Sequence, residues 1–224
     1  ATFSPIRDPS SVGNGVHIHM SFYDKSGSPQ TYDPNGTCGM SRLTNSFVAG
    51  VLKYLDSILA ITAASAISYL RLTPHRWSAA FNNLGYLDRE ASLRICPVTV
   101  KDPISIAEQF NIEFRAADAA ACPHLALAAI VHAGAQGIEE GLISNEPTEE
   151  DLSLLSVDKL TKRGYIRLPE TLEAALNCMS TNKILRNWFG DTFVDVYLLH
   201  KHSELEYVKD MDDIARCAEY ERTY

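Results

Sequence analysis

The stretch "GNGVHIHMSF", residues 13–22, constrains the fold more tightly than any other part of the chain. Its apolar and polar residues alternate, which is the pattern of a β-strand with one face turned to the core. The polar face of this strand would carry His17, His19 and Ser21. Glycines before the strand allow its backbone to approach a ligand closely. Histidines on one face of a strand are most often solvated, so periodicity alone does not assign them to a site.

The next part of the chain mixes one long helix with short strand-like runs. Apolar residues at helical spacing predict an amphipathic helix over 43–66, with Thr44 as its N-cap. Residues 67–98 contain short β-rich runs between turn signals, among them "SYLRLTP", and "FNIEFRAAD" indicates a further strand.

The second half of the chain is mainly helical. A helix is expected from Pro123, with Gly134 and Gly137 weakening its far end. The polar segment 142–161 is expected to be a surface excursion, and the remainder reads as helices. Short strands followed by helices, without strict alternation, favour an α+β architecture.

Composition limits the classes of partner. A net charge of −8 argues against general binding to nucleic acid or to an anionic membrane. Five cysteines without a CxxC pair indicate reduced thiols in a cytoplasmic protein. No stretch has the pattern of a signal peptide or a membrane span. The first residue is not Met, so we expect these 224 residues to be a piece of a longer chain.

Charged residues on the later runs could form a site. Glu113 and Arg115 would share one face of their strand, as a structural ion pair or as a hard-metal ligand beside a carboxylate-binding fork. Arg71, Arg89 and Arg94 lie between the two histidines and this pair, and each reads first as a surface charge. Arg89 and Arg94 are an odd number of residues apart, so on one straight strand their side chains would point to opposite faces. A bulge or bend would be needed to bring both to one site. Together these residue types suit ATP, a divalent metal and a carboxylate.

Four motifs, taken in order, resemble the catalytic domain of the glutamine synthetase family: "GNGVHIHMS", "SYLRLTP", "REASLRICP" and "EFRAADAAACPHLALAAIVHAGAQGIEEGL". The resemblance implies that residues 1–224 are the C-terminal part of that domain. The implied fold is a glutamine synthetase/guanido kinase-like α+β domain, with short antiparallel strands forming a curved sheet flanked by helices. The family's N-terminal β-grasp domain and its upstream metal-binding glutamates would lie outside this chain.

The resemblance also implies an activity in which ATP phosphorylates the γ-carboxylate of glutamate and ammonia or another amine displaces the phosphate. Mg²⁺ or Mn²⁺ would be bound by His17 and Glu113. ATP would be contacted by His19, Ser21, Arg89 and Arg94. Glutamate would be held by Gly13, Arg71 and Arg115, with Arg89 and Arg115 as catalytic residues. The full-length protein would form a homo-oligomeric ring, act in glutamine biosynthesis and nitrogen metabolism, and bind neither nucleic acid nor membrane.

Several positions depart from the family pattern: Val12, Trp77, Asn111, Cys122 and His124. Trp77 stands where ammonia-using members have a glutamate that closes the ammonium pocket and takes its proton. A tryptophan accepts no proton, although its face attracts cationic amines. The alternative reading of Trp77 is an aromatic core residue within the loop.

Three hypotheses therefore remain open at the level of sequence. The chain is part of a glutamate–ammonia ligase, of a γ-glutamyl ligase for a larger amine, or of a non-catalytic homologue that kept the fold. The isolated 224-residue chain is predicted to have no ligase activity, because one glutamate and one histidine cannot complete a magnesium shell.

Overall fold

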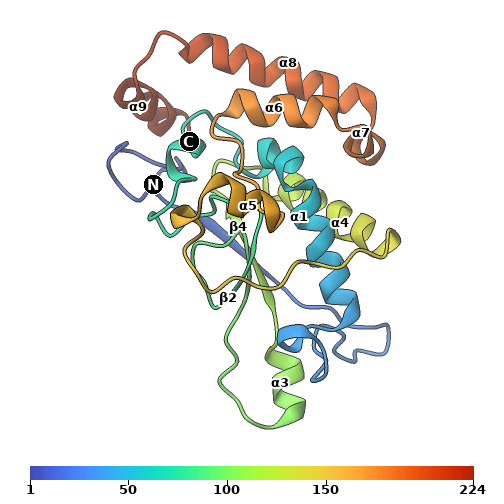
Figure 1. Ribbon diagram of the computed structural model, residues 1–224. Helices are drawn as coiled ribbons and strands as arrows, with labels where there is room; N and C mark the ends of the chain where they lie inside the picture. Colours follow the sequence, from blue (N-terminus) through green and yellow to red (C-terminus); the bar gives the residue numbers. More distant parts are fainter.

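The computed structural model describes residues 1–224 (Figure 1). The strands are β1 (Val16–Met20), β2 (Leu84–Tyr86), β3 (Leu93–Ile95) and β4 (Ile112–Ala117). The helices are α1 (Arg42–Thr62), α2 (Ser68–Arg71), α3 (Pro103–Gln109), α4 (Pro123–Glu139), α5 (Val157–Lys162), α6 (Leu172–Thr181), α7 (Lys183–Phe189), α8 (Asp191–Val208) and α9 (Asp213–Thr223). Two 3-10 turns are η1 (Thr37–Gly39) and η2 (Leu152–Leu154). The α+β class expected from the sequence is confirmed.

The strands form one mixed sheet in the order β1-β4-β3-β2. β4 is antiparallel to β1 and to β3, but β2 and β3 are parallel, so the expectation of an all-antiparallel sheet is wrong for this pair. Each of these two strands has three residues, so the chain travels back only about 10 Å between them. Residues 87–92 make that return, with Leu87 at a φ of 63°.

Helices α1 and α4 pack closely because glycines meet where they touch. A Cβ on Gly50 would lie 2.3 Å from the Ala133 carbonyl oxygen, and one on Gly134 would lie 2.1 Å from the Phe47 ring. A Cβ on Gly137 would lie 2.4 Å from the Gly50 Cα. The α4 glycines therefore let the helices approach, and α4 continues through them to Glu139. Their expected role as weak points of the helix is corrected.

Two local predictions differ from the structure. The N-cap of α1 is Ser41, whose side chain accepts from the Thr44 backbone N–H, while the Thr44 hydroxyl donates to the Thr31 carbonyl at 2.8 Å. "SYLRLTP" forms the single helical turn α2 rather than a strand. The Ser68 hydroxyl lies 3.2 Å from the Ser65 backbone nitrogen, which stabilises a turn at this point.

The polar segment 142–161 is more than a surface excursion. Thr148 is buried, its N–H donates to the Leu84 carbonyl at 2.8 Å, and its carbonyl accepts from the Tyr86 N–H at 3.0 Å. The segment therefore lies along β2, and Leu152 on η2 is buried behind it.

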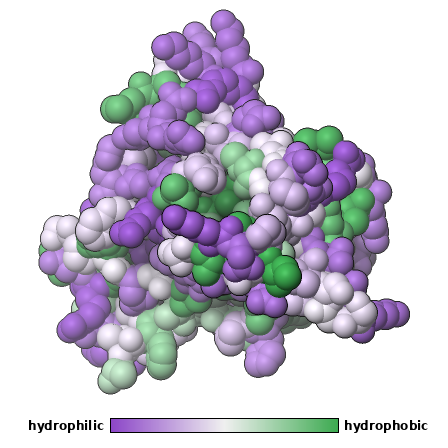
Figure 2. Space-filling model, turned by 90° about the horizontal axis from the view of Figure 1, so that it is seen from below, coloured by the Kyte–Doolittle hydropathy of each residue, from purple (hydrophilic) through white to green (hydrophobic).

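The last third of the chain is helical, as expected, but its final stretch divides into α8 and α9. Helices α6 and α8 lie side by side at the top of Figure 1, with α9 beyond them. None of the helices combines the length and apolar character that crossing a membrane requires. On the face seen in Figure 2, hydrophilic residues prevail and hydrophobic ones form separate small groups.

Candidate active site

A carboxylate surrounded by basic side chains lies on the sheet. We call Glu113, Arg94, Arg115, His17 and His19 the Glu113 cluster. Oε1 of Glu113 accepts a hydrogen bond from Arg115 Nη1 at 2.8 Å and lies 2.8 Å from His17 Nδ1. Its Oε2 accepts from Arg94 Nη1 at 3.0 Å, and His19 Nε2 lies 3.5 Å from Oε1. The structure thus brings both predicted metal ligands and three other predicted site residues together.

Strand register explains this convergence. Glu113 is paired across the sheet with His19 on β1 and with Arg94 on β3, so three strands contribute to one row. Arg115 lies two residues along β4 on the same face, and Phe114 between them is fully buried on the other. The shared face predicted for Glu113 and Arg115 is confirmed.

The charges of the cluster stabilise one another. Burial disfavours the Glu113 carboxylate, but the charge of Arg115 and hydrogen bonds from Arg94 and Arg115 outweigh it and lower the pKa of Glu113. Burial and the neighbouring Arg115 lower the pKa of His17 and so favour its neutral form. A neutral imidazole beside an ionised carboxylate is a donor pair that suits a divalent metal.

The arginines have more donors than the protein uses. The Nε atoms of Arg71, Arg94 and Arg115 are buried and have no hydrogen-bond partner. Unpaired buried donors are rare and costly, so these three guanidinium groups keep hydrogen-bonding capacity that the protein's own acceptors do not use. Phosphate or carboxylate oxygens are the acceptors that guanidinium groups bind best.

Arg71 lies beneath the glycine hinge that precedes β1. Its Nη1 donates to Ser78 Oγ at 2.8 Å and its Nη2 to the Ala117 carbonyl at 2.9 Å, and the residue is buried. A Cβ on Gly15 would lie 2.8 Å from Arg71 Nη1. Gly13 has a φ of 77°, and its Cβ would lie 2.6 Å from the Pro5 carbonyl oxygen. The hinge is therefore glycine because the backbone must close over Arg71.

Two predicted nucleotide contacts lie at the rim. Ser21 is exposed just beyond the end of β1, and Arg89 is exposed in the turn before β3. Arg89 and Arg94 were expected on opposite faces of one strand, but Arg89 lies outside β3, which begins only at Leu93. The Arg89 carbonyl, rather than its side chain, joins it to the cluster by accepting from Arg115 Nη2 at 2.8 Å.

Two residues beside His19 were not assigned a role from the sequence. Asn111 Nδ2 donates to the Gln109 carbonyl at 2.8 Å, which leaves its Oδ1 to accept from His19 Nδ1 at 2.8 Å. His19 then has its Nε2 lone pair free on the side of Glu113. The Cys96 thiol lies 3.8 Å from Glu113 Oε2, and burial raises its pKa to about 11. His19, Cys96 and Glu113 lie close enough together to hold one ion.

The loop that carries Trp77 is held against the cluster. Arg115 Nη2 donates to the Trp77 carbonyl at 3.3 Å. The Glu90 carboxylate accepts from the backbone N–H groups of His75 at 2.8 Å and Trp77 at 3.3 Å. His75 and Trp77 have positive φ values of 63° and 52°, a costly conformation for such residues that these bonds stabilise. Trp77 is 68% exposed, so its alternative reading as a core aromatic is wrong.

Sequence reasoning missed Glu90 as the residue that fixes this loop. Its only signal was its place directly after Arg89 in "DREASLR", because a bond from a side chain to a backbone N–H has no sequence pattern. The role of Asn111 was missed for a similar reason, since it was noted only as a departure from the family.

Comparisons with known proteins agree with this geometry. Residues 1–220 match the family described as "Glutamine synthetase, catalytic domain". The chain is 34% identical over its whole length to a gamma-glutamylpolyamine synthetase of Streptomyces coelicolor, of which it covers 47%. It is 32% identical over 95% of its length to type-1 glutamine synthetase 1 of Dictyostelium discoideum, of which it covers 41%. The chain therefore spans about half the length of these curated relatives.

Solved structures share the fold. A crystal structure of a novel glutamine synthase homolog superimposes with a TM-score of 0.86 at 39% identity, over all of this chain and 48% of that one. A GmaS/ADP complex superimposes with a TM-score of 0.78 at 23% identity, over 97% of this chain and 48% of the other, and shows the likeness of fold alone. The ordered motifs, the Glu113 cluster and the match over residues 1–220 place this chain in the glutamine synthetase family, as part of its catalytic domain.

Proposed function

We propose that the complete protein is an ATP-dependent carboxylate–amine ligase that joins glutamate to an amine larger than ammonia. The observation that carries the ligase proposal is the Glu113 cluster, where a carboxylate and a neutral histidine lie beside buried guanidinium donors without partners. Such a site suits an anionic substrate, its phosphate donor and a metal at the same time. The named relatives, glutamine synthetases and a gamma-glutamylpolyamine synthetase, support the same class of reaction.

The residues present fit a hard divalent metal in part. His17 and Glu113 would supply a nitrogen and an oxygen ligand, 2.8 Å apart in this structure. A magnesium shell needs roughly six ligands, so the remaining ones would come from substrate, water and other parts of the complete protein. Bound there, Mg²⁺ or Mn²⁺ would neutralise phosphate charge.

The arginines would hold the two anionic substrates. Arg94 is half-buried beside Glu113, and Arg89 is exposed at the rim, which suits contacts to ATP phosphates along with His19 and Ser21. Arg115 would orient the glutamate substrate and stabilise charge in the transfer, while Arg71 and Gly13 shape the floor of that site.

In the reaction, a glutamate γ-carboxylate oxygen attacks the γ-phosphorus of ATP, and ADP leaves. The amine nitrogen then attacks the γ-carbonyl carbon, the C–N bond forms, phosphate leaves, and the nitrogen loses a proton. The positions of the arginines would favour both steps, because negative charge increases on oxygen in each.

Trp77 favours a larger amine over ammonia. The Trp77 backbone carbonyl contacts Arg115 of the cluster, and its indole is exposed. An indole accepts no proton and offers a π-face to a cationic or aromatic amine. A compact ammonium ion gains little from such a surface and would lack its balancing carboxylate.

The test is an amine panel assayed on the complete gene product with ATP, glutamate and Mg²⁺. We expect amine-dependent phosphate release with polyamines or aryl amines, and a lower kcat/KM with ammonia. If ammonia is used best, the proposed amine class is wrong. If no amine supports turnover while ATP still binds, the protein is a non-catalytic homologue.

Other features of the complete protein stay predictions from the family resemblance. These are an N-terminal β-grasp domain, further metal-binding glutamates, assembly into a homo-oligomeric ring and a cytoplasmic location. The mass of the purified complete protein in solution would test the ring.

A further inference from the structure

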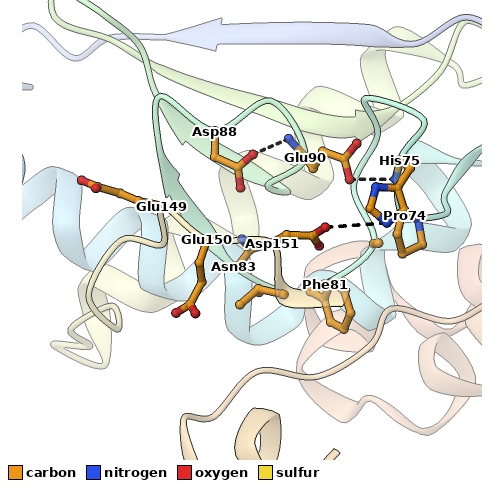
Figure 3. A pocket seen from close by; sticks show the side chains of 11 residues that line it. Pro74, His75, Phe81, Asn83, Asp88, Glu90, Glu149, Glu150 and Asp151 are labelled. Carbon is orange, nitrogen blue, oxygen red and sulfur yellow. Dashed lines mark hydrogen bonds and ion pairs between the residues drawn. The ribbon is translucent and has the colours of Figure 1, made fainter. Parts of the chain in front are cut away.

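A small acidic cavity lies on the far side of the Trp77 loop from the Glu113 cluster. It has a volume of about 150 Å³ and lies between the loop at Pro74 and His75, the start of β2, and residues 149–152 (Figure 3). Its lining includes five carboxylates: Asp88, Glu90, Glu149, Glu150 and Asp151. In Figure 3, Asp88, Glu90 and Asp151 lie around the hollow, whereas Glu149 extends away from it.

An unsatisfied acceptor in the lining makes this more than a cluster of acids. Asn83 is 2% exposed, and its Oδ1 has no hydrogen-bond partner. Its orientation is fixed, because the Thr148 hydroxyl donates to the Leu84 carbonyl and so must accept from Asn83 Nδ2 at 2.8 Å. The amide oxygen therefore remains as a buried acceptor in the cavity lining. Such an atom calls for a donor that the protein does not supply.

The rest of the lining suits an aliphatic chain. Pro74, Ala80, Phe81 and Leu152 contribute apolar surface between the carboxylates. A volume of about 150 Å³ holds roughly five water molecules, or an alkylammonium of similar size. A bare metal ion would leave the apolar wall unused.

The basic groups near the cavity do not neutralise it. His75 Nε2 lies 3.6 Å from Asp151 Oδ2, and Arg163 pairs with Glu150 at the outer side. Burial is the largest effect on Asp88 and raises its pKa, and repulsion from Glu90 and Asp151 acts in the same direction. The hydrogen bond from the Glu90 backbone N–H and the charge of Arg115 oppose this rise without reversing it.

The cavity is joined to the candidate active site through one residue. Glu90 lines it and also binds the Trp77 backbone N–H, while the Trp77 carbonyl accepts from Arg115. The loop thus has the reacting centre on one side and the acidic cavity on the other.

We propose that this acidic cavity binds the second ammonium group of a diamine or polyamine whose first nitrogen is the one that reacts. The inference rests on the proposed amine ligase function and assigns its substrate class to particular residues. Asp88 and Asp151 provide charge, Asn83 provides a neutral acceptor, and the apolar lining contacts the methylene chain.

The test compares 1,4-diaminobutane with butylamine as substrates of the complete gene product. The two amines share chain length and differ in the second ammonium group. We expect a higher kcat/KM for the diamine, and the Asp88→Asn variant should reduce the diamine-to-monoamine ratio by about fivefold. Asp151→Asn is a second, independent variant with the same expected direction. Both replacements keep the side-chain shape and the oxygen that binds local N–H groups.

Glu146→Gln is the matched control. This exposed carboxylate precedes the cavity residues in the same segment but does not line the cavity, so its removal should leave the ratio unchanged. The inference alone is overturned if both amines are used and neither Asp variant changes the ratio. If neither amine is used and ammonia is, the inference and the proposed function fail together. Circular dichroism of each variant confirms that it is folded.

Discussion

The Glu113 cluster and the acidic cavity are both charged sites, but the chain builds them differently. All side chains of the cluster come from β1, β3 and β4, where register fixes their positions. The cavity is built from turns and irregular segments on either side of β2, and its loop includes residues with positive φ. In the cluster the carboxylate is paired with guanidinium groups, whereas in the cavity the carboxylates outnumber their cations.

This difference separates what is common to a reaction class from what selects a substrate. Phosphate and carboxylate chemistry needs donors held at fixed positions, and neighbouring strands provide them. The choice of an amine needs only a different surface at the edge of the active site. Loops accept such changes at little cost to the stability of the fold. The predictions below test whether the two regions are independent.

The largest effect should come from the cluster. Glu113→Gln would leave Arg94 and Arg115 buried beside a neutral amide, so we expect the complete protein to lose about 3 kcal/mol of stability in urea unfolding. Ligase activity should fall by about a thousandfold. The loss of stability does not depend on the proposed function.

Glu139→Gln is the control for this variant, because Glu139 is an exposed carboxylate at the end of α4. Its stability should change by less than about 0.5 kcal/mol. An equally small change for Glu113→Gln would show that the cluster is not a stabilising network.

The second effect concerns amine choice. Trp77→Glu restores the side chain expected in ammonia-using members, so the ratio of kcat/KM for ammonia to that for butylamine should rise by about a hundredfold. Initial rates of phosphate release measure it. Trp77→Phe, which keeps an aromatic face, should change the ratio far less. A similar rise with Phe would mean that bulk, rather than a missing carboxylate, excludes ammonia.

Sequence predicted the cluster better than the cavity for a physical reason. Alternation along a strand places His17 with His19, and Glu113 with Arg115, without knowledge of the fold. That these residues meet at one site came from the family resemblance, and which strands are neighbours came from the structure. Asn111 escaped a functional assignment because its bond to His19 joins residues that are 92 positions apart in the sequence, and such pairs leave no local signal.

The cavity escaped prediction because its parts come from three segments of irregular backbone. The acidic run at 146–151 was read as a surface excursion, and nothing in its composition shows that Thr148 is paired with β2. Strand assignments failed at "SYLRLTP" because the run is apolar enough for either state, and the turn at Ser65 and Ser68 decides for a helix.

A smaller effect should come from the residue between the two regions. Glu90→Ala removes the acceptor for two backbone N–H groups, so the Trp77 loop should become mobile at a local cost of about 1–2 kcal/mol. The fluorescence anisotropy of Trp77, taken as the difference from Trp77→Phe, should fall, and KM for the amine should rise by about fivefold. Glu90→Gln keeps one acceptor and should give an intermediate result. Unchanged anisotropy in both variants would exclude Glu90 as the residue that holds the loop.

The smallest effect is a pH dependence of opposite sign in the two regions. Burial, with repulsion from Glu90 and Asp151, raises the native pKa of Asp88 above 3.8, so its carboxylate costs stability once the pH rises through that pKa. Asp88→Asn should therefore stabilise the protein by about 0.5 kcal/mol at pH 7, and the gain should vanish below about pH 3.8. Despite its burial, Glu113 has a lowered pKa because of Arg115 and Arg94, so it contributes stability at neutral pH that is lost in acid. We therefore expect the free energy of unfolding, measured in urea from pH 3.5 to 7, to lie above that of the wild type for Asp88→Asn and below it for Glu113→Gln. Both differences should shrink as the pH falls. Curves on the same side would mean that the cavity carboxylate is paired in the native protein, which would remove the need for a cationic ligand there.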